Sequence, residues 1–315
     1  MHYEKWRALG SEAAIFLADA DEKIGRAAVA SIKNELDVFE RRFSRFLPES
    51  ELSRLNAAAG QNFSASAEMI DLLKVARELY RETDGIFDPL ILPELLRAGY
   101  TKSFDTHLEI RFPSDLGVQL PSGRHGFSEV FIDEARGAVR LPAGAMIDLG
   151  GIGKGYAADR ISEILVKNFK NFWISLGGDI RFFGDFKSNP WMVGVQDPFS
   201  HDNDLFDLAI GGEFCAVATS GTTKRRFTHS DGREPSHHII DPRSGPPAAS
   251  GIVAATVVAD SAARADVLAK SALILGAQAG VELINKLPRA ECLLIDDKGA
   301  TYFSDGMRAL AKPLK

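Results

Sequence analysis

The stretch Ile147-Asp148-Leu149-Gly150-Gly151-Ile152-Gly153-Lys154-Gly155-Tyr156 is the most informative part of this chain for its fold. Its glycines let the backbone approach a ligand closely, and it leads into a pattern typical of a helix. The first N–H groups of a helix lack partners within the helix, and Lys154 adds a positive charge at the same place. The segment therefore suits a phosphate or pyrophosphate, although such glycine-rich turns are purely structural at least as often. It fits neither the dinucleotide fingerprint nor the P-loop pattern.

Strands dominate the sequence on both sides of this stretch. Short alternating segments precede it over residues 130–147, and a helix over 156–167 is followed by a strand pair over 171–183 with a Gly-Gly turn. Further strands are expected over residues 191–195, 207–210, 251–258 and 290–295, and a helix over 261–275. Because most connections resemble hairpins, we predict an α+β fold with a largely antiparallel sheet and packed helices, as one domain over residues 1–315.

The N-terminal part of the chain predicts two helices after a first strand over residues 13–17. Apolar residues recur on one face over residues 21–46, with charged residues on the other faces. The second helix is expected over residues 66–83, with Ser66 as its N-cap and Gly85 just beyond its end.

Composition excludes several classes of protein. The chain has 315 residues and a net charge of -6, which argues against broad nucleic-acid binding because that needs a basic face. No window reaches the roughly 18 uninterrupted apolar residues of a membrane span. The N-terminus has no apolar signal region and no cysteine suited to lipid attachment. We therefore expect no integral membrane segment, and a cytoplasmic location unless a leader has been removed.

The two cysteines, Cys215 and Cys292, each lie in an apolar run. Free cysteine is among the most buried residue types, so we expect two buried core thiols. Their number and spacing predict neither a zinc site nor a disulfide framework.

Three further segments carry turn-rich or chemically active patterns. Ser175-Leu176-Gly177-Gly178-Asp179-Ile180 suits a tight hairpin or a close approach to a ligand. The stretch from Thr219 to Phe227, then Asp231-Gly232 and His237-His238-Ile239-Ile240-Asp241-Pro242, includes histidines that titrate near neutrality, although His238 could equally bond to a neighbouring turn. In the third, Asp260 to Asp266, the last carboxylate lies near the start of a helix, where the dipole favours it even without a ligand.

The order of these segments resembles that of the ApbE family. Phe43-Ser44-Arg45-Phe46-Leu47-Pro48-Glu49-Ser50-Glu51-Leu52 is similar to the family's early motif, and Asp84-Gly85-Ile86-Phe87-Asp88-Pro89 to its "DGAFDPT" turn. The likeness runs from Leu9-Gly10-Ser11 to Asp297-Lys298-Gly299, nearly the whole chain. It implies a T-fold-like architecture and an enzyme that binds FAD and Mg²⁺, moves FMN to a threonine hydroxyl of an acceptor protein and releases AMP.

The resemblance also implies roles for particular residues. The metal ligands would be the Gly151 carbonyl and the Asp266 side chain, and His238 would assist proton transfer. The residues expected to contact FAD are Leu9, Phe46, Ala98, Gly99, Tyr100, Asp148, Lys154 and Ile240. A hard cation with one carboxylate, a carbonyl and phosphate oxygens is a sparse shell of the kind that Mg²⁺ accepts.

The sequence departs from the family pattern most sharply at Lys270. The family usually has a threonine there, four residues after Asp266, whose hydroxyl shares the metal. A protonated lysine cannot ligate Mg²⁺. Either Lys270 joins the catalytic site and partly replaces the cation with its own charge, or the site holds FAD without efficient turnover; in a third interpretation it turns to solvent. Leu90 replaces a usual Thr, Leu92 a usual Gly and Ala98 a usual Trp.

Three functions from different classes follow from these observations. The first is the flavin transferase, with FAD and an acceptor protein bearing a target threonine as partners. The second is a non-catalytic FAD-binding module, and the third is a hydrolase that releases FMN and AMP from FAD. The sequence names neither the acceptor nor the oligomeric state.

Overall fold

The computed structural model describes residues 1–101, 124–184, 190–200, 202–212, 215–224, 226–227 and 236–314. The chain divides into two compact units, and each is described by itself. Unit 1 contains Met1–Asp37, Ile152–Lys224 and Ala249–Lys315, and unit 2 contains Val38–Gly151 and Arg225–Ala248. The boundary at Asp37 falls within the long helix α1 (Glu22–Phe43).

An eight-stranded sheet forms the centre of unit 1, in the order β1-β2-β6-β7-β10-β13-β14-β15. Every neighbouring pair in it is antiparallel, which confirms the predicted α+β class with a largely antiparallel sheet. The strands are β1 (His2–Ala8), β2 (Ser11–Leu17), β6 (Phe172–Leu176), β7 (Asp179–Phe183), β10 (Ala216–Gly221), β13 (Ile252–Ala259), β14 (Ala290–Asp296) and β15 (Thr301–Phe303).

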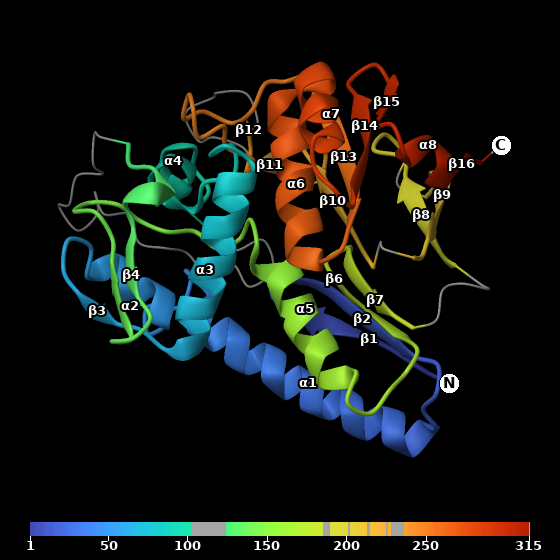
Figure 1. Cartoon of the computed structure of the whole chain (residues 1–315), viewed down its shortest axis with the longest axis horizontal. Coiled ribbons are helices and arrows are strands. Elements are labelled where there is room, and N and C mark those ends of the chain that lie inside the picture. Colours follow the sequence, from blue (N-terminus) through green and yellow to red (C-terminus); the bar gives the residue numbers. More distant parts are fainter. Residues whose placement is uncertain are drawn as a thin grey trace. The chain divides into compact units, whose positions relative to one another are not determined.

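The two faces of this sheet have different partners (Figure 1). Helices α5 (Gly153–Leu165) and α6 (Ala262–Leu275) pack on β6, β7, β10 and β13, and α7 (Ala277–Asn285) lies beside α6. A three-stranded sheet, β16-β9-β8, covers the other face. Its elements are β8 (Trp191–Gln196), β9 (Asp204–Ile210) and β16 (Ala311–Pro313), next to α8 (Met307–Leu310). The core between the sheets contains Phe182, Val195, Leu208, Val258 and Leu293.

Unit 2 is built from short helices and small sheets. Helix α3 (Ala67–Glu82) buries its apolar stripe and is capped by Ser66, whose hydroxyl accepts a hydrogen bond from the Met69 N–H at 3.1 Å. The remaining elements are α2 (Glu51–Ala57), η1 (Pro89–Ile91), α4 (Leu92–Arg97), η3 (Phe127–Glu129), the sheet of β3 (Phe63–Ser64), β5 (Ala138–Arg140) and β4 (Phe131–Asp133), and the pair β11 (Arg226–Phe227) and β12 (Ser236–His237).

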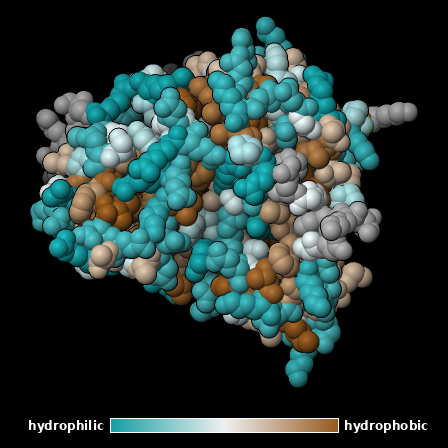
Figure 2. Space-filling view, in the orientation of Figure 1, coloured by the Kyte–Doolittle hydropathy of each residue, from teal (hydrophilic) through white to brown (hydrophobic). Residues whose placement is uncertain are grey.

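The predicted long helices are present, and so are the short strands expected over 130–147 and 171–183, which correspond to β4, β5, β6 and β7. The helices expected over 21–46, 66–83, 156–167 and 261–275 correspond to α1, α3, α5 and α6, with ends displaced by a few residues. Strand β1 was not predicted, and neither were helices α2, α4 and α7, which are too short to give a clear periodic signal. No helix of the described residues is long and apolar enough to cross a membrane. On the face drawn in Figure 2, hydrophobic residues occur in small scattered groups among hydrophilic ones.

One of the two thiols differs from expectation. Cys292 is buried, and that burial raises the pKa of its thiol to about 12. Cys215 is only half-buried, because it precedes β10 and its thiol lies beside Arg181. Its Sγ donates to the Asp260 carbonyl at 3.0 Å.

Candidate functional site

The glycine-rich segment leads into a helix, as predicted, although α5 begins within the segment at Gly153 rather than at residue 156. One of its glycines sets how α5 packs. The N-cap residue Ile152 provides no side-chain hydrogen bond to the first turn. At Gly155, a Cβ would lie well inside contact distance of the Ala262 carbonyl oxygen, so only glycine lets α5 approach α6 this closely. The Asp159 carboxylate then accepts the N–H groups of Ala262 and Ala263, both at 2.9 Å. Helices α5 and α6 are therefore held together at the start of α6.

Two tight hairpin turns lie close to Lys154. Gly177 and Gly178 join β6 to β7 with φ of 66° and 95°, as in a type I′ turn, so the predicted hairpin is confirmed. A Cβ on Gly177 would lie 2.8 Å from Ser11 Oγ and 3.1 Å from Lys154 Cε. Ser11 follows the β1–β2 turn, in which Leu9 has a φ of 51°. A positive φ at a non-glycine residue is strained and often occurs at functional sites.

Four charged side chains form a compact group in unit 1, here called the charge cluster: Lys154, Asp179, Asp266 and Lys270. Lys154 Nζ donates to Asp179 Oδ2 at 2.7 Å, and Lys270 Nζ donates to Asp266 Oδ1 within the same helical face. The two aspartate side chains are buried, with exposures of 3% and 2%, whereas each lysine side chain is 16% exposed. Burial raises the pKa of Asp179, the charge of Asp266 raises it further, and the two lysines oppose both effects.

In unit 2, a buried arginine organises several of the residues expected to contact a ligand. Arg45 Nε lies 2.7 Å from Asp148 Oδ2, and both guanidinium Nη atoms donate to the Tyr100 carbonyl at 3.3 Å. The guanidinium carbon lies 4.4 Å from the centroid of the Phe46 ring and 4.5 Å from that of Tyr100. The other Asp148 oxygen accepts the Gly150 N–H at 2.8 Å. Ionic, aromatic and backbone groups are thus fixed around one guanidinium.

The end of α4 places Tyr100 in this group. The N–H of Tyr100 donates to the Leu95 carbonyl at 2.9 Å, the N–H of Gly99 donates to Leu96 at 3.0 Å, and Gly99 has a φ of 92°. This pattern is a Schellman motif, which explains why a glycine precedes the tyrosine. Tyr100 and Ala98 pack against a cluster that includes Ile240, and the Tyr100 ring meets the His238 ring edge-to-face at 6.1 Å.

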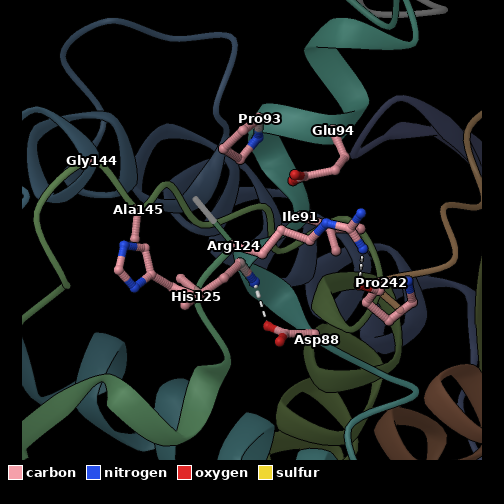
Figure 3. Close-up of a pocket in the computed structure, with 10 residues that line it drawn as sticks. Asp88, Ile91, Pro93, Glu94, Arg124, His125, Gly144, Ala145 and Pro242 are labelled. Atoms are coloured by element: carbon pink, nitrogen blue, oxygen red, sulfur yellow. Dashed lines mark hydrogen bonds between the residues drawn. The ribbon is translucent and has the colours of Figure 1, made fainter. Parts of the chain in front are cut away.

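A cleft in unit 2 was not predicted. Asp88, Glu94, Arg124 and His125 line it, and Arg124 reaches toward Pro242 at its side (Figure 3). Arg124 donates to the Ser244 carbonyl at 2.6 Å, so its guanidinium holds the turn after Asp241. Burial raises the pKa of Asp88 to about 6, although its oxygens accept N–H groups from Leu90 and Phe127.

The predicted site residues gather into two groups, one in each unit. Unit 1 brings together Lys154, Asp266 and Lys270, and unit 2 brings together Phe46, Ala98, Gly99, Tyr100, Asp148, His238 and Ile240. The interpretation in which Lys270 turns to solvent is wrong, because its ammonium is bound by Asp266 on the next turn of α6. The proposed metal role of the Gly151 carbonyl stays a prediction, and Asp231-Gly232 lies outside the described residues.

Two members of these groups were missed from the sequence. Asp179 follows the Gly177-Gly178 turn directly, and Arg45 precedes Phe46 in the early motif. Each of them is a charged residue next to a residue that had been selected. No sequence pattern indicated which oppositely charged side chain each would bind. Only the fold shows that Asp179 binds Lys154 and that Arg45 binds Asp148.

Comparisons with known proteins show the family of this chain. The sequence matches the ApbE family over residues 9–294. It is 28% identical over 312 residues to the FAD:protein FMN transferase of Klebsiella pneumoniae (strain 342), covering 97% of this chain and 92% of that protein. It is 26% identical over 294 residues to the FAD:protein FMN transferase of Vibrio cholerae, covering 92% and 85%. The ApbE protein of Thermotoga maritima has a similar crystal structure, with a TM-score of 0.84, 28% identity and 99% of each chain covered. With a match that extends over nearly its whole length, this chain belongs to the ApbE family.

Proposed function

We propose that this chain transfers FMN from FAD to a threonine hydroxyl of an acceptor protein and releases AMP. The observation that carries the proposal is the charge cluster, which holds two lysine ammonium groups beside the glycine-rich start of α5. A diphosphate is the part of FAD that such a positive site would hold. The similarity to two FAD:protein FMN transferases over most of the chain supports the same activity.

The reaction exchanges the phosphoanhydride bond of FAD for a phosphoester bond to threonine. The threonine oxygen forms a bond to the phosphorus of the FMN half, the bond from that phosphorus to the bridging oxygen breaks, and AMP leaves with that oxygen. The hydroxyl proton must pass to a base, and His238 is proposed for this step because imidazole titrates near neutral pH. Phe46, Tyr100, Asp148 and Ile240 are proposed to hold FAD, since they form one packed group in unit 2.

The charge cluster leaves one carboxylate oxygen for a bound Mg²⁺. Asp266 Oδ2 is buried and has no hydrogen-bond partner among the described residues, which is a suitable state for a carboxylate oxygen that binds a cation. Within the same residues, no three His, Cys, Asp or Glu side chains gather as a metal site, so phosphate oxygens and water would complete the shell. We propose Asp266 and the Gly151 carbonyl as ligands. A bound Mg²⁺ would offset the charge of the departing phosphate.

One incubation tests the proposal against its alternatives. The purified protein is mixed with FAD, MgCl₂ and a threonine-bearing acceptor peptide, and the products are separated and identified by mass spectrometry. FMN attached to the peptide, together with an equal amount of AMP, is the expected result. A peptide with the threonine replaced by alanine is the control and should stay unlabelled.

Other outcomes would replace the proposal. Free FMN and AMP that form equally with either peptide indicate a hydrolase. Intact FAD bound to the protein indicates a binding module. Absence of FAD binding, with or without MgCl₂, would refute a flavin function of any kind.

A further inference from the structure

The charge cluster has two negative and two positive side chains, and the two kinds differ in burial. The Asp179 and Asp266 side chains are almost fully buried in unit 1, while the side chains of Lys154 and Lys270 are each 16% exposed. Each lysine is bound by one carboxylate, so both ammonium groups are fixed in position before any ligand arrives. A site built in this way presents positive charge to a ligand without a metal ion.

The position of Lys270 follows from the geometry of α6. Residues four apart lie on the same face of a helix, so Lys270 reaches back over Asp266. Its Nζ contacts Asp266 Oδ1 and lies 3.4 Å from the Asp266 backbone carbonyl oxygen. Most residues of α6 are buried, Asp266 among them, so the pair lies on a helix whose surroundings are mainly apolar. The contact is therefore a local property of the helix and does not depend on a mobile loop.

Lys270 changes what Asp266 can offer to a divalent cation. Of the two carboxylate oxygens, Oδ1 is occupied by the ammonium and only Oδ2 lacks a hydrogen-bond partner in the described chain. The fixed ammonium also repels a second cation at the same carboxylate. A metal ion at Asp266 would thus have one oxygen in place of two and an adjacent positive charge.

The same positive charges that disfavour a metal ion favour the binding of an anionic ligand. The start of α5 carries Lys154 and has no side-chain cap on its N-terminus, so its N–H groups add to the positive potential. Gly177 provides the space in which the Lys154 side chain lies. Two ammonium groups and a helix N-terminus are a sufficient set of donors for the two charged phosphates of a dinucleotide.

We propose that Lys270 is a fixed internal cation of the FAD site, so that this chain binds FAD without a divalent cation. The inference rests on the proposed function, because it takes FAD as the ligand. It concerns the binding step, whereas Mg²⁺ is proposed above for the transfer step. In the binding step, the ammonium group of Lys270 thereby offsets the negative charge of the diphosphate, a role that a metal ion would otherwise have.

The test measures the affinity of the flavin-free protein for FAD by titration calorimetry, in excess EDTA and in excess MgCl₂. The unaltered protein should give the same Kd within about threefold in both. Lys270→Met should weaken binding in EDTA by roughly 10–100-fold, the value of a lost charge-assisted hydrogen bond, and MgCl₂ should recover part of the loss. Lys270→Arg keeps the charge and should stay closer to the unaltered protein than Lys270→Met does.

A second measurement needs no FAD. Mn²⁺ titrated into the flavin-free protein and followed by electron paramagnetic resonance should bind more tightly to Lys270→Met than to the unaltered protein, because Oδ1 of Asp266 is released. Lys286→Met removes an exposed lysine from the end of α7 and should change neither measurement.

Several outcomes would overturn the inference, and they differ from failure of the proposed function. FAD binding that requires MgCl₂ in the unaltered protein contradicts it while leaving a flavin transferase intact. Equal affinity of Lys270→Met and the unaltered protein in EDTA contradicts it as well. No FAD binding by the unaltered protein in either buffer removes the proposed function itself.

Discussion

The pair formed by Arg45 and Asp148 gives the sharpest prediction for unit 2. Both side chains are buried, at 5% and 9% exposure, and their charged atoms lie 2.7 Å apart. Arg45→Met leaves the Asp148 carboxylate buried without its partner, which typically costs about 3–5 kcal/mol of stability. It also removes the guanidinium from between the rings of Phe46 and Tyr100, although methionine retains part of the apolar contact.

The pairwise part of this loss can be separated with a double-mutant cycle. Asp148→Asn leaves Arg45 buried without a carboxylate and should also destabilise strongly. The double variant Arg45→Met with Asp148→Asn leaves neither charge unpaired, so its loss should fall short of the sum of the single losses by about 2–3 kcal/mol.

The choice of probe matters because the chain has two compact units. All three tryptophans, Trp6, Trp173 and Trp191, lie in unit 1, so their fluorescence would miss a transition confined to unit 2. Urea unfolding should therefore be followed by circular dichroism, with hydrogen exchange of the Gly150 amide as a local measure of the same site.

A matched control is available in the same unit. Arg54→Met removes an exposed arginine from α2 and should change stability by no more than about 0.5 kcal/mol. Additive losses in the cycle, within about 0.5 kcal/mol, would refute the reasoning, because independent sites add to that precision. In that case Arg45 would act through its packing alone.

Three further results are expected. Gly155→Ala should lower the melting temperature by several degrees, because its Cβ would meet the Ala262 carbonyl. Gly153→Ala on the same helix has open space around its Cβ and should be neutral or stabilising. Equal effects of the two substitutions would contradict the close packing of α5 on α6. The pKa of Asp88 is about 6 in the folded state against an ordinary 3.8, so the folded state holds the proton more tightly than the unfolded state does. The free energy of unfolding should therefore fall by about 3 kcal/mol as pH rises from about 4 to 6. Asp88→Asn should remove this pH dependence in urea titrations, and an unchanged dependence would show that another group causes it. Lys270→Thr should raise Mg²⁺-dependent FMN transfer because both Asp266 oxygens become available to the metal, and transfer rates unchanged over a MgCl₂ series would show that Lys270 does not limit it.

The sequence by itself determined the long elements and the location of the turns. A helix of four or more turns repeats its apolar face often enough to be recognised, as in α1 and α3, and the Gly-Gly turn fixes the hairpin of β6 and β7 because both residues need a positive φ. The ordered motifs also identified the family, and the glycine-rich stretch correctly located the start of α5. These are local signals, contained within short windows of the chain.

The partners of the charged residues were decided only by the tertiary structure. Lys154 and Asp179 are 25 residues apart, and they meet because Gly177 leaves room for the lysine beside the β6–β7 turn. Lys270 could be placed near Asp266 from helical spacing alone, but the burial that fixes their contact depends on how α6 packs against the sheet. Ion pairing over long separations depends on which elements become neighbours, and no periodic pattern encodes that choice. The balance of charge beside the glycine-rich stretch is therefore a property of the folded chain.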